Sequence, residues 1–196
     1  MQALMRQMAV PVLGAVVLAL GGAGAPAAMA QGAEHARHEA GDPRGRAGAL
    51  IKAVRESTER FKDVAAAEAE GYGLMFGCVS GPDYGAMGLH YVNFPLVQDI
   101  ALDPAKPEIV IYEPLPNGRK RLVGADFLVF AEAWHAKHAE TPQVMGQLMH
   151  LIESPNRYGL PAFYTLHVWA WKESASGPFV NWHPTVSCGN FDDEKD

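Results

Sequence analysis

Apolar side chains recur every three or four positions between residues 46 and 70, which is the spacing of one face of an α-helix. Charged residues fill the positions between them, and Gly71 and Gly73 follow, where glycine commonly ends a helix. The pattern predicts one amphipathic helix over 46–70, whose single apolar stripe has to cover another element. The stripe consists of Ala47, Leu50, Ile51, Val54, Thr58, Phe61 and Ala65.

Segments further along the chain have the alternation and the β-branched and aromatic content of strands. Between two of them, Asn117-Gly118 is a two-residue hairpin signal. A helix followed by antiparallel strands predicts an α+β fold, with the N-terminal amphipathic helix packed on a curved antiparallel sheet of roughly four to six strands. A small β-barrel with one helix is the alternative. The predicted strands are 87–93, 107–114, 121–130 and 163–171.

The N-terminal residues have the pattern of a secretory signal peptide. Arg6 provides a positive charge, and residues 8–20 form an apolar run that is too short to span a bilayer comfortably. Small residues at positions 28 and 30 then suit a signal-peptidase site. We therefore expect a signal peptide over 1–30 and a periplasmic or secreted mature chain.

The mature chain has one domain's worth of sequence. We expect a disordered leader over 31–45, a single α+β domain over 46–190 and an acidic tail over 191–196. The whole chain has a net charge of −6, which argues against binding to a nucleic-acid backbone. No second apolar run reaches transmembrane length, so no membrane span is expected after signal removal.

The chain contains two cysteines, Cys78 and Cys188. In an oxidising compartment an even pair of cysteines is most simply a disulfide. Such a bond would close a loop of about 110 residues, which stabilises by roughly 4 to 5 kcal/mol in the chain-entropy model before strain is subtracted. A two-thiolate metal site is the alternative, although no CxxC spacing is present.

Two histidines on predicted strands are the main candidates for chemistry. His167 shares a strand face with aromatic residues, and a histidine at such a position must find partners for both ring nitrogens. His90 lies on another strand among small residues, so the two imidazoles could reach one point. Imidazoles with a carboxylate form the ligand set of many Zn, Cu, Fe and Ni sites. The expected face of the His167 strand is Phe163, Thr165, His167, Trp169 and Trp171.

The predicted hairpin supplies the carboxylates. A two-residue turn at 117–118 pairs Ile109 with Asp126 and Glu113 with Leu122. Glu113 and Asp126 then share a face but lie about 13 Å apart, at about 3.3 Å per residue. One ion would therefore use one of them unless a bulge intervenes. Asp126 lies deeper, where an unpaired carboxylate is costly, whereas Glu113 near the turn remains open as a ligand.

Other interpretations remain open at this point. Both histidines could be hydrogen-bonded core residues, or a histidine and a carboxylate could act as an acid–base pair without metal, so the sequence does not decide whether the protein is an enzyme. The chain could instead bind a small molecule or an envelope protein through aromatic and methionine side chains. We interpret His135, His138 and His150 as surface residues. The candidate side chains for binding are Met75, Phe76, Met87, Trp134, Met145 and Met149.

The segments GLHYVN, YEP, LVGADF, LHVWAWK and NWHPTVSC follow FKDVAAAEAEGY along the chain. Together they resemble a family of uncharacterised, signal-peptide-bearing bacterial secreted proteins. The resemblance covers nearly the whole mature chain, and it implies the fold unit and export rather than a reaction. The family pattern usually has Asn where this chain has His183, so the resemblance does not imply that His183 is a ligand.

Overall fold

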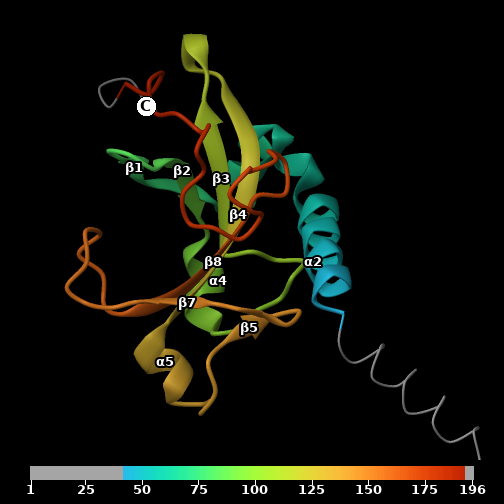
Figure 1. Ribbon diagram of the computed structural model, residues 1–196. Coiled ribbons are helices and arrows are strands. Elements are labelled where there is room, and N and C mark those ends of the chain that lie inside the picture. Colours follow the sequence, from blue (N-terminus) through green and yellow to red (C-terminus); the bar gives the residue numbers. More distant parts are fainter. Residues whose placement is uncertain (1–41, 193–196) are drawn as a thin grey trace, which may run out of the picture. The chain divides into compact units, whose positions relative to one another are not determined.

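The structure, a computed structural model, describes residues 42–192, and Figure 1 shows how their elements are arranged. The predicted signal peptide, most of the predicted leader and the end of the predicted acidic tail lie outside the described residues. The helices are α2 (Pro43–Thr58), η1 (Glu59–Lys62), α3 (Val64–Ala69), α4 (Phe94–Asp99), η2 (Pro116–Gly118) and α5 (Ala131–His135). The strands are β1 (Gly73–Gly81), β2 (Gly85–Val92), β3 (Ile109–Pro114), β4 (Lys120–Phe130), β5 (Gln143–Val144), β6 (Gln147–Leu148), β7 (His150–Ile152) and β8 (Phe163–Val168).

Six strands form one antiparallel sheet in the order β1-β2-β3-β4-β8-β7, and β5 pairs with β6 in a separate ribbon. The six-stranded sheet is curled, and α2 runs along one side of it (Figure 1). The predicted α+β fold with a curved antiparallel sheet is therefore confirmed. The closed barrel is not formed by the described strands, because β1 and β7 are the two edges of the sheet and do not pair with each other.

The predicted helix over 46–70 is broken into three pieces. α2 begins at Pro43, where Asp42 accepts a hydrogen bond from the Arg44 backbone, and it ends at Thr58. Asp63 then adopts an extended backbone and accepts a hydrogen bond from Ala65 N, so it acts as the N-cap of α3. A single continuous helix was therefore wrong. The apolar spacing continues across the breaks because all three pieces pack against the same side of the sheet.

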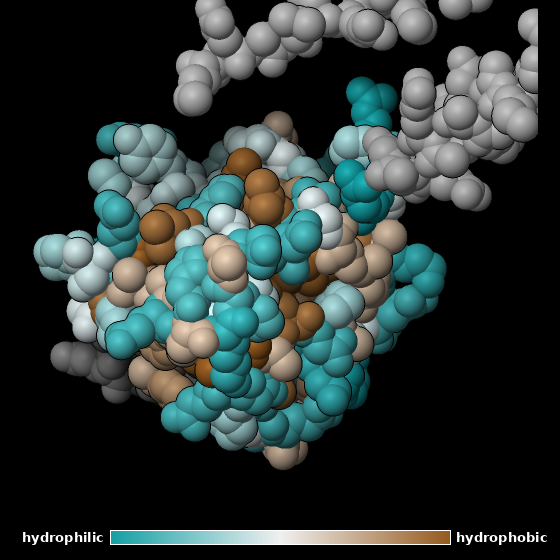
Figure 2. All heavy atoms as spheres, turned by 90° about the horizontal axis from the view of Figure 1, so that it is seen from below, coloured by the Kyte–Doolittle hydropathy of each residue, from teal (hydrophilic) through white to brown (hydrophobic). Residues whose placement is uncertain are grey.

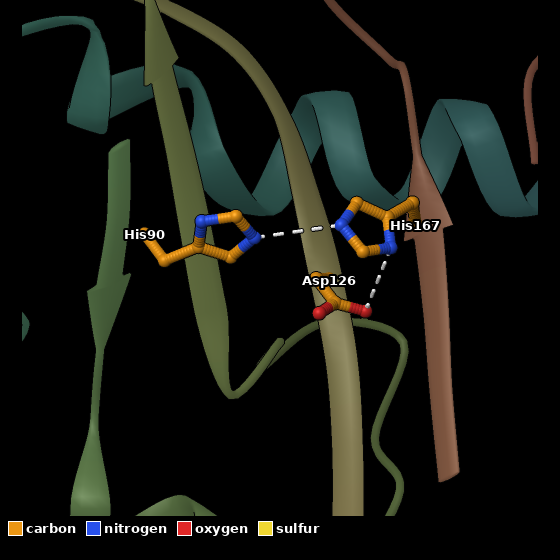
Figure 3. A group of neighbouring side chains, drawn as sticks. All are labelled: His90, Asp126 and His167. Atoms are coloured by element: carbon orange, nitrogen blue, oxygen red, sulfur yellow. Dashed lines mark hydrogen bonds and ion pairs between the residues drawn. The ribbon is translucent and has the colours of Figure 1, made fainter. Parts of the chain in front are cut away.

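The curled sheet separates two faces with different roles. Leu50 and Val54 of α2 pack against Phe127 of β4 and Leu166 of β8 on the helix-covered face. Asp126 alternates with Phe127, so it points to the opposite face. In Figure 3 a helix passes behind the strands while the candidate side chains lie in front of them. Strand alternation thus directs the polar candidates away from the helices.

The predicted strands were found with shorter or shifted ends, and two other strands of the six-stranded sheet were missed, as was the short β5–β6 ribbon. The strand predicted over 163–171 stops at Val168, and Trp171 turns to the helix side, where its Nε1 donates to Thr58 Oγ1 at 2.9 Å. The prediction that Trp171 shares the face of His167 was therefore wrong. β1 was missed because its glycines and a bulge after Met75 remove the alternation, and β7 is too short to show a pattern.

The predicted disulfide is present between Cys78 of β1 and Cys188 in the C-terminal segment, with 110 positions between the two in sequence. It attaches this segment to the edge strand of the sheet and rules out the two-thiolate metal site. Among the described residues, no helix has both the length and the apolar character that crossing a membrane requires.

Candidate metal centre

Three strands of the six-stranded sheet, β2, β4 and β8, bring His90, Asp126 and His167 together. Asp126 of β4 lies directly opposite His167 of β8, and β3 separates β4 from β2, which carries His90. The three side chains point toward one another on the face away from the helices (Figure 3). Their residues are only 7%, 2% and 2% exposed for His90, Asp126 and His167 respectively. The fold therefore buries a polar group that needs internal partners.

The two imidazoles approach each other through one nitrogen each. His90 Nε2 lies 3.5 Å from His167 Nε2, and the rings meet at an interplanar angle of 79°. His90 Nδ1 lies 3.3 Å from the backbone oxygen of Gly88, which can only accept a hydrogen bond. In a neutral ring one nitrogen carries the hydrogen, so His90 carries it on Nδ1 and directs the lone pair of Nε2 toward His167.

The other nitrogen of His167 also faces acceptors. His167 Nδ1 lies 3.6 Å from Asp126 Oδ1 and 3.5 Å from Thr165 Oγ1. The Thr165 hydroxyl already donates to Asp126 Oδ1 at 2.6 Å, so its hydrogen is not available to His167. A hydrogen on Nδ1 of His167 is favoured, and the Nε2 lone pair then faces His90. Two lone pairs directed at each other are an arrangement that a cation between them would stabilise.

Hydrogen bonds from two residues of β8 hold the Asp126 carboxylate in place. Besides Thr165, the backbone N–H of Leu166 donates to Asp126 Oδ1 at 3.0 Å. Burial raises the pKa of Asp126 to about 6, although these two hydrogen bonds oppose the rise because they favour the charged form. Asp126 is therefore a carboxylate at neutral pH, and one negative charge lies beside the two imidazoles.

Both imidazoles are held in their neutral form. Burial, together with the neighbouring His167, lowers the pKa of His90 to about 4. Burial, followed by the charge of His150, lowers the pKa of His167 to about 3. Burial disfavours the charged form of histidine, and the neutral ring is the form that binds a metal ion. A proton shared between the rings is therefore disfavoured at neutral pH.

The geometry suits one metal ion. One ligand atom from each of His90, Asp126 and His167 lies within 4.8 Å of the others. Ligand nitrogens about 2.0–2.1 Å from an ion lie roughly 3.3–3.5 Å apart when the angle at the ion is near tetrahedral. The 3.5 Å between the two Nε2 atoms meets that requirement. The cluster could hold a metal ion without rearrangement of the strands.

The cluster forms the polar end of an apolar cavity of about 170 Å³. Met75, Phe76 and Met87, three of the side chains predicted to line a pocket, do line it. The other three do not. Trp134 and Met149 pack with the core on the helix side of the sheet, and Met145 is exposed.

Glu113 is not brought to the cluster. It accepts hydrogen bonds from Arg121 and Lys172, at 2.9 Å from Lys172 Nζ, and from Ser187 N at 3.2 Å. Burial alone would raise the pKa of Glu113, but Arg121 and Lys172 lower it overall. Its predicted pairing with Leu122 was wrong by one residue, because a bulge lies between Leu122 and Gly124 and places Arg121 opposite Glu113. Glu113 therefore has a local ion-pair role.

The other histidines within residues 42–192 lie outside the cluster. His183 is fully buried, accepts a hydrogen bond from Thr185 N at 3.2 Å and packs edge-to-face on Trp169. His135 and His138 are exposed around α5, as predicted, with His138 stacked on Trp134. His150 is also exposed, as predicted. Its position opposite Thr165 in β7 nevertheless brings its charge near the cluster, and this proximity contributes to the low pKa of His167.

Three residues that support the cluster were missed from the sequence. Thr165 was placed on the correct face, but its hydrogen bond to Asp126 was not anticipated. Asn181 lines the cavity, and its buried side-chain oxygen has no close hydrogen-bond partner among the described residues. The Asn181 side chain raises the pKa of His167 and so partly offsets the lowering by burial. Gly88 has a φ of 92° and lies so near Tyr112 that a Cβ would be 2.5 Å from its backbone oxygen. A larger residue would therefore be strained at this position, whose carbonyl oxygen lies 3.3 Å from His90 Nδ1.

No protein-family model, no curated protein and no solved structure matches the chain. The resemblance noted from the sequence segments therefore stays a prediction. The arrangement of the buried side chains is the basis for any functional conclusion.

Proposed function

We propose that the protein binds one transition-metal ion through His90 Nε2 and His167 Nε2, with Asp126 supplying the negative charge. The observation that carries this proposal is that both Nε2 atoms face each other at 3.5 Å while the second nitrogen of each ring faces an acceptor. Metal-bound histidines are oriented in this way, by a carbonyl or carboxylate at the other ring nitrogen. Asp126 and the Gly88 carbonyl occupy those positions.

Two imidazoles and a carboxylate suit Zn²⁺, Cu²⁺, Fe²⁺ or Ni²⁺. With two imidazoles as its protein ligands, the ion keeps positions open for water or another ligand, and the apolar cavity lies directly beside the cluster. Whether the bound ion serves storage, transport or a reaction depends on that further ligand. The core-histidine alternative requires one Nε2 to donate to the other, which the acceptors around both Nδ1 atoms disfavour.

The test is metal analysis and calorimetry on the exported chain, purified without a His tag. Because His35 and His38 lie outside the described residues, both are replaced by Gln in the starting chain, so that they cannot contribute binding. We expect one ion per chain, and at least a tenfold loss of Zn²⁺ affinity in His90→Gln and in His167→Gln. His138→Gln, which removes an exposed histidine, is the matched control and keeps full affinity.

A different pair of results would contradict the proposed metal site. If the starting chain holds much less than one ion and its affinity for Zn²⁺, Cu²⁺, Fe²⁺ and Ni²⁺ is the same in His90→Gln and His167→Gln, the metal site does not exist. The two histidines are then core residues. Unfolding curves of each variant identify any that fail to fold, so that a lost fold is not taken for a lost ligand.

We also propose that the chain is exported to the periplasm or secreted. The sequence pattern over 1–30 supports export, and the Cys78–Cys188 disulfide is the kind of bond that persists in oxidising compartments. Sequencing the N-terminus of the chain recovered from the periplasm tests this. A mature chain that begins near Gln31 is the expected result, and retention of Met1 in the cytoplasm contradicts it.

A further inference from the structure

The apolar cavity beside the cluster is unusual for a small core. Interiors are close-packed, and the cost of a void in a core rises with its volume. A cavity of about 170 Å³ is comparable with an engineered apolar cavity of about 150 Å³ that stays dry and binds benzene. The chain thus leaves an unfilled apolar space of about the size of one aromatic ring beside the cluster.

The lining of the cavity is suited to a neutral ligand. Aliphatic, methionine and aromatic side chains make up most of the wall, and among the described residues that line it none is Lys or Arg. Asp126 is the one carboxylate among the described residues of the wall. An anion would therefore find no cationic partner in an apolar space, which is costly.

Two half-exposed aromatic side chains mark where the cavity meets the surface. Phe76 of β1 is 47% exposed and Phe94 of α4 is 49% exposed, and both line the cavity. Large apolar residues on the surface of this protein occur between hydrophilic ones, as on the face in Figure 2. Phe76 and Phe94 differ from scattered surface residues because they border one cavity.

Phe76 is held there by its backbone. Its φ of 63° lies in the left-handed region, which is unfavourable for an aromatic residue, and it lies in the bulge between Met75 and Cys78. The bulge turns the Phe76 ring to within 5.7 Å of the Tyr158 ring, measured between centroids. Strained backbone of this kind is found where a binding site is pre-organised.

We propose that this cavity binds a small neutral apolar molecule of about the size of one aromatic ring, entering between Phe76 and Phe94. The inference goes beyond the proposed metal site, because the walls would bind the ring with or without an ion. A ligand seated there would lie beside His90 and His167, in the position from which it could meet a bound ion.

The experiment uses the full mature chain after chelator treatment, with toluene, benzene and benzoate as probes. Saturable shifts of the Met75 and Met87 methyl signals in NMR spectra report binding. We expect toluene and benzene to bind at least tenfold more tightly than benzoate. Ile152→Trp, which fills the cavity from β7, should lower toluene affinity at least tenfold. Leu151→Trp is the matched control, because this neighbouring residue is exposed and does not line the cavity.

The outcomes separate the two proposals. If neither toluene nor benzene shifts the two methyl signals, or if benzoate binds as tightly as toluene, the ligand inference is overturned, whatever the metal analysis gives. If Ile152→Trp and Leu151→Trp weaken toluene binding equally, the ring is bound elsewhere and the inference again fails. Ring binding with the expected variant effects supports the cavity even where the chain binds no metal ion.

Discussion

His90 Nε2 lies 3.5 Å from His167 Nε2, although the two residues are separated by 77 positions in the sequence. The contact exists because β3 and β4 hold β2 and β8 at a fixed spacing and strand alternation turns both rings to one face. The contact joins a side chain of β2 to a side chain of β8 across the two strands between them. The chemistry of the cluster therefore depends on the curl of the whole sheet rather than on one loop.

Both rings should remain uncharged at pH 6 in the metal-free protein. Their pKa values of about 4 for His90 and about 3 for His167 lie below the ordinary value of 6.5. Between the lowered and the ordinary values the unfolded chain binds protons that the folded chain does not, so acid weakens the fold through these rings. Ring ¹⁵N chemical shifts recorded from pH 7 to pH 4 measure this directly. Protonation of either ring near pH 6.5 would contradict the burial argument.

Asp126 opposes that acid effect, which is why NMR is preferred to unfolding curves. Its pKa is raised from 3.8 to about 6, so in that interval the folded chain holds a proton that the unfolded chain has lost. This contribution to stability is present at low pH and is lost as the pH rises through about 6. The ¹⁵N shifts separate the rings from the carboxylate.

Thr165→Val should weaken metal binding about 10- to 100-fold, the range found when the groups that orient metal ligands are changed. The valine keeps the shape of the side chain and its strand preference but removes the 2.6 Å hydrogen bond to Asp126 Oδ1. Without that bond the pKa of Asp126 rises, and the carboxylate is less firmly aligned with His167. Calorimetry with Zn²⁺ at pH 7 measures the loss, and Thr165→Ser is the control that restores the hydroxyl. Equal affinities for all three chains would show that the hydrogen bond from Thr165 to Asp126 takes no part in metal binding.

Glu113→Gln should lower the free energy of unfolding by about 1–3 kcal/mol and leave the metal content unchanged. The carboxylate is buried and accepts hydrogen bonds from Lys172 and Arg121, whose charges would be left without their partner. Urea unfolding and metal analysis of the same preparation test both parts. Loss of metal without loss of stability would restore Glu113 as a ligand.

The disulfide should contribute about 2–5 kcal/mol to stability, the usual range for a native bond. Replacing Cys78 and Cys188 together by serine removes it without leaving a free thiol. Urea unfolding of the double variant should show a lower midpoint, with an unchanged Zn²⁺ affinity under native conditions, because neither sulfur belongs to the metal cluster. A double variant as stable as the starting chain would show that the disulfide does not stabilise the fold.

The register of the β3–β4 hairpin shows what could be predicted from the sequence. The pairing of Ile109 with Asp126 was predicted correctly, although the loop spans 116–118 rather than two residues, because the bulge between Leu122 and Gly124 offsets the extra loop residue. Nearer the turn the pairing was wrong by one residue, since the extra residue of a bulge leaves no clear trace in the alternation. The acid that reaches the cluster could thus be favoured from the sequence, but the ion-pair role of Glu113 could not.

The meeting of His90 and His167 was a hypothesis from the sequence rather than a derivation. Strand alternation gives the face of each side chain, but it does not say which edge of the hairpin each neighbouring strand joins. That choice depends on long-range packing, including the segment held by Cys188, and on β1, whose glycines hid it. The helix break at Asp63 was missed for a related reason, because the apolar stripe continues across it.

Glu108 lies immediately before β3. It is almost fully buried, and its Oε2 accepts a hydrogen bond from Leu128 N at 3.1 Å. Burial raises its pKa from 4.5 to about 8, and the nearby carboxylate of Asp126 adds to the rise although the Leu128 hydrogen bond opposes it. Between these values the folded chain keeps a proton that the unfolded chain loses. The stabilising contribution is therefore complete at low pH and is lost as the pH rises through about 8.

Glu108→Gln keeps the shape and the acceptor for Leu128 N but removes this titration. The difference in free energy of unfolding, variant minus starting chain, should therefore increase by up to about 1.4 kcal/mol per pH unit between pH 5 and pH 8. Urea unfolding at several pH values gives the difference, in which contributions from His90, His167 and Asp126 cancel because both chains carry them. Parallel curves for the two chains would mean that Glu108 loses its proton near its ordinary pKa, as an exposed carboxyl does.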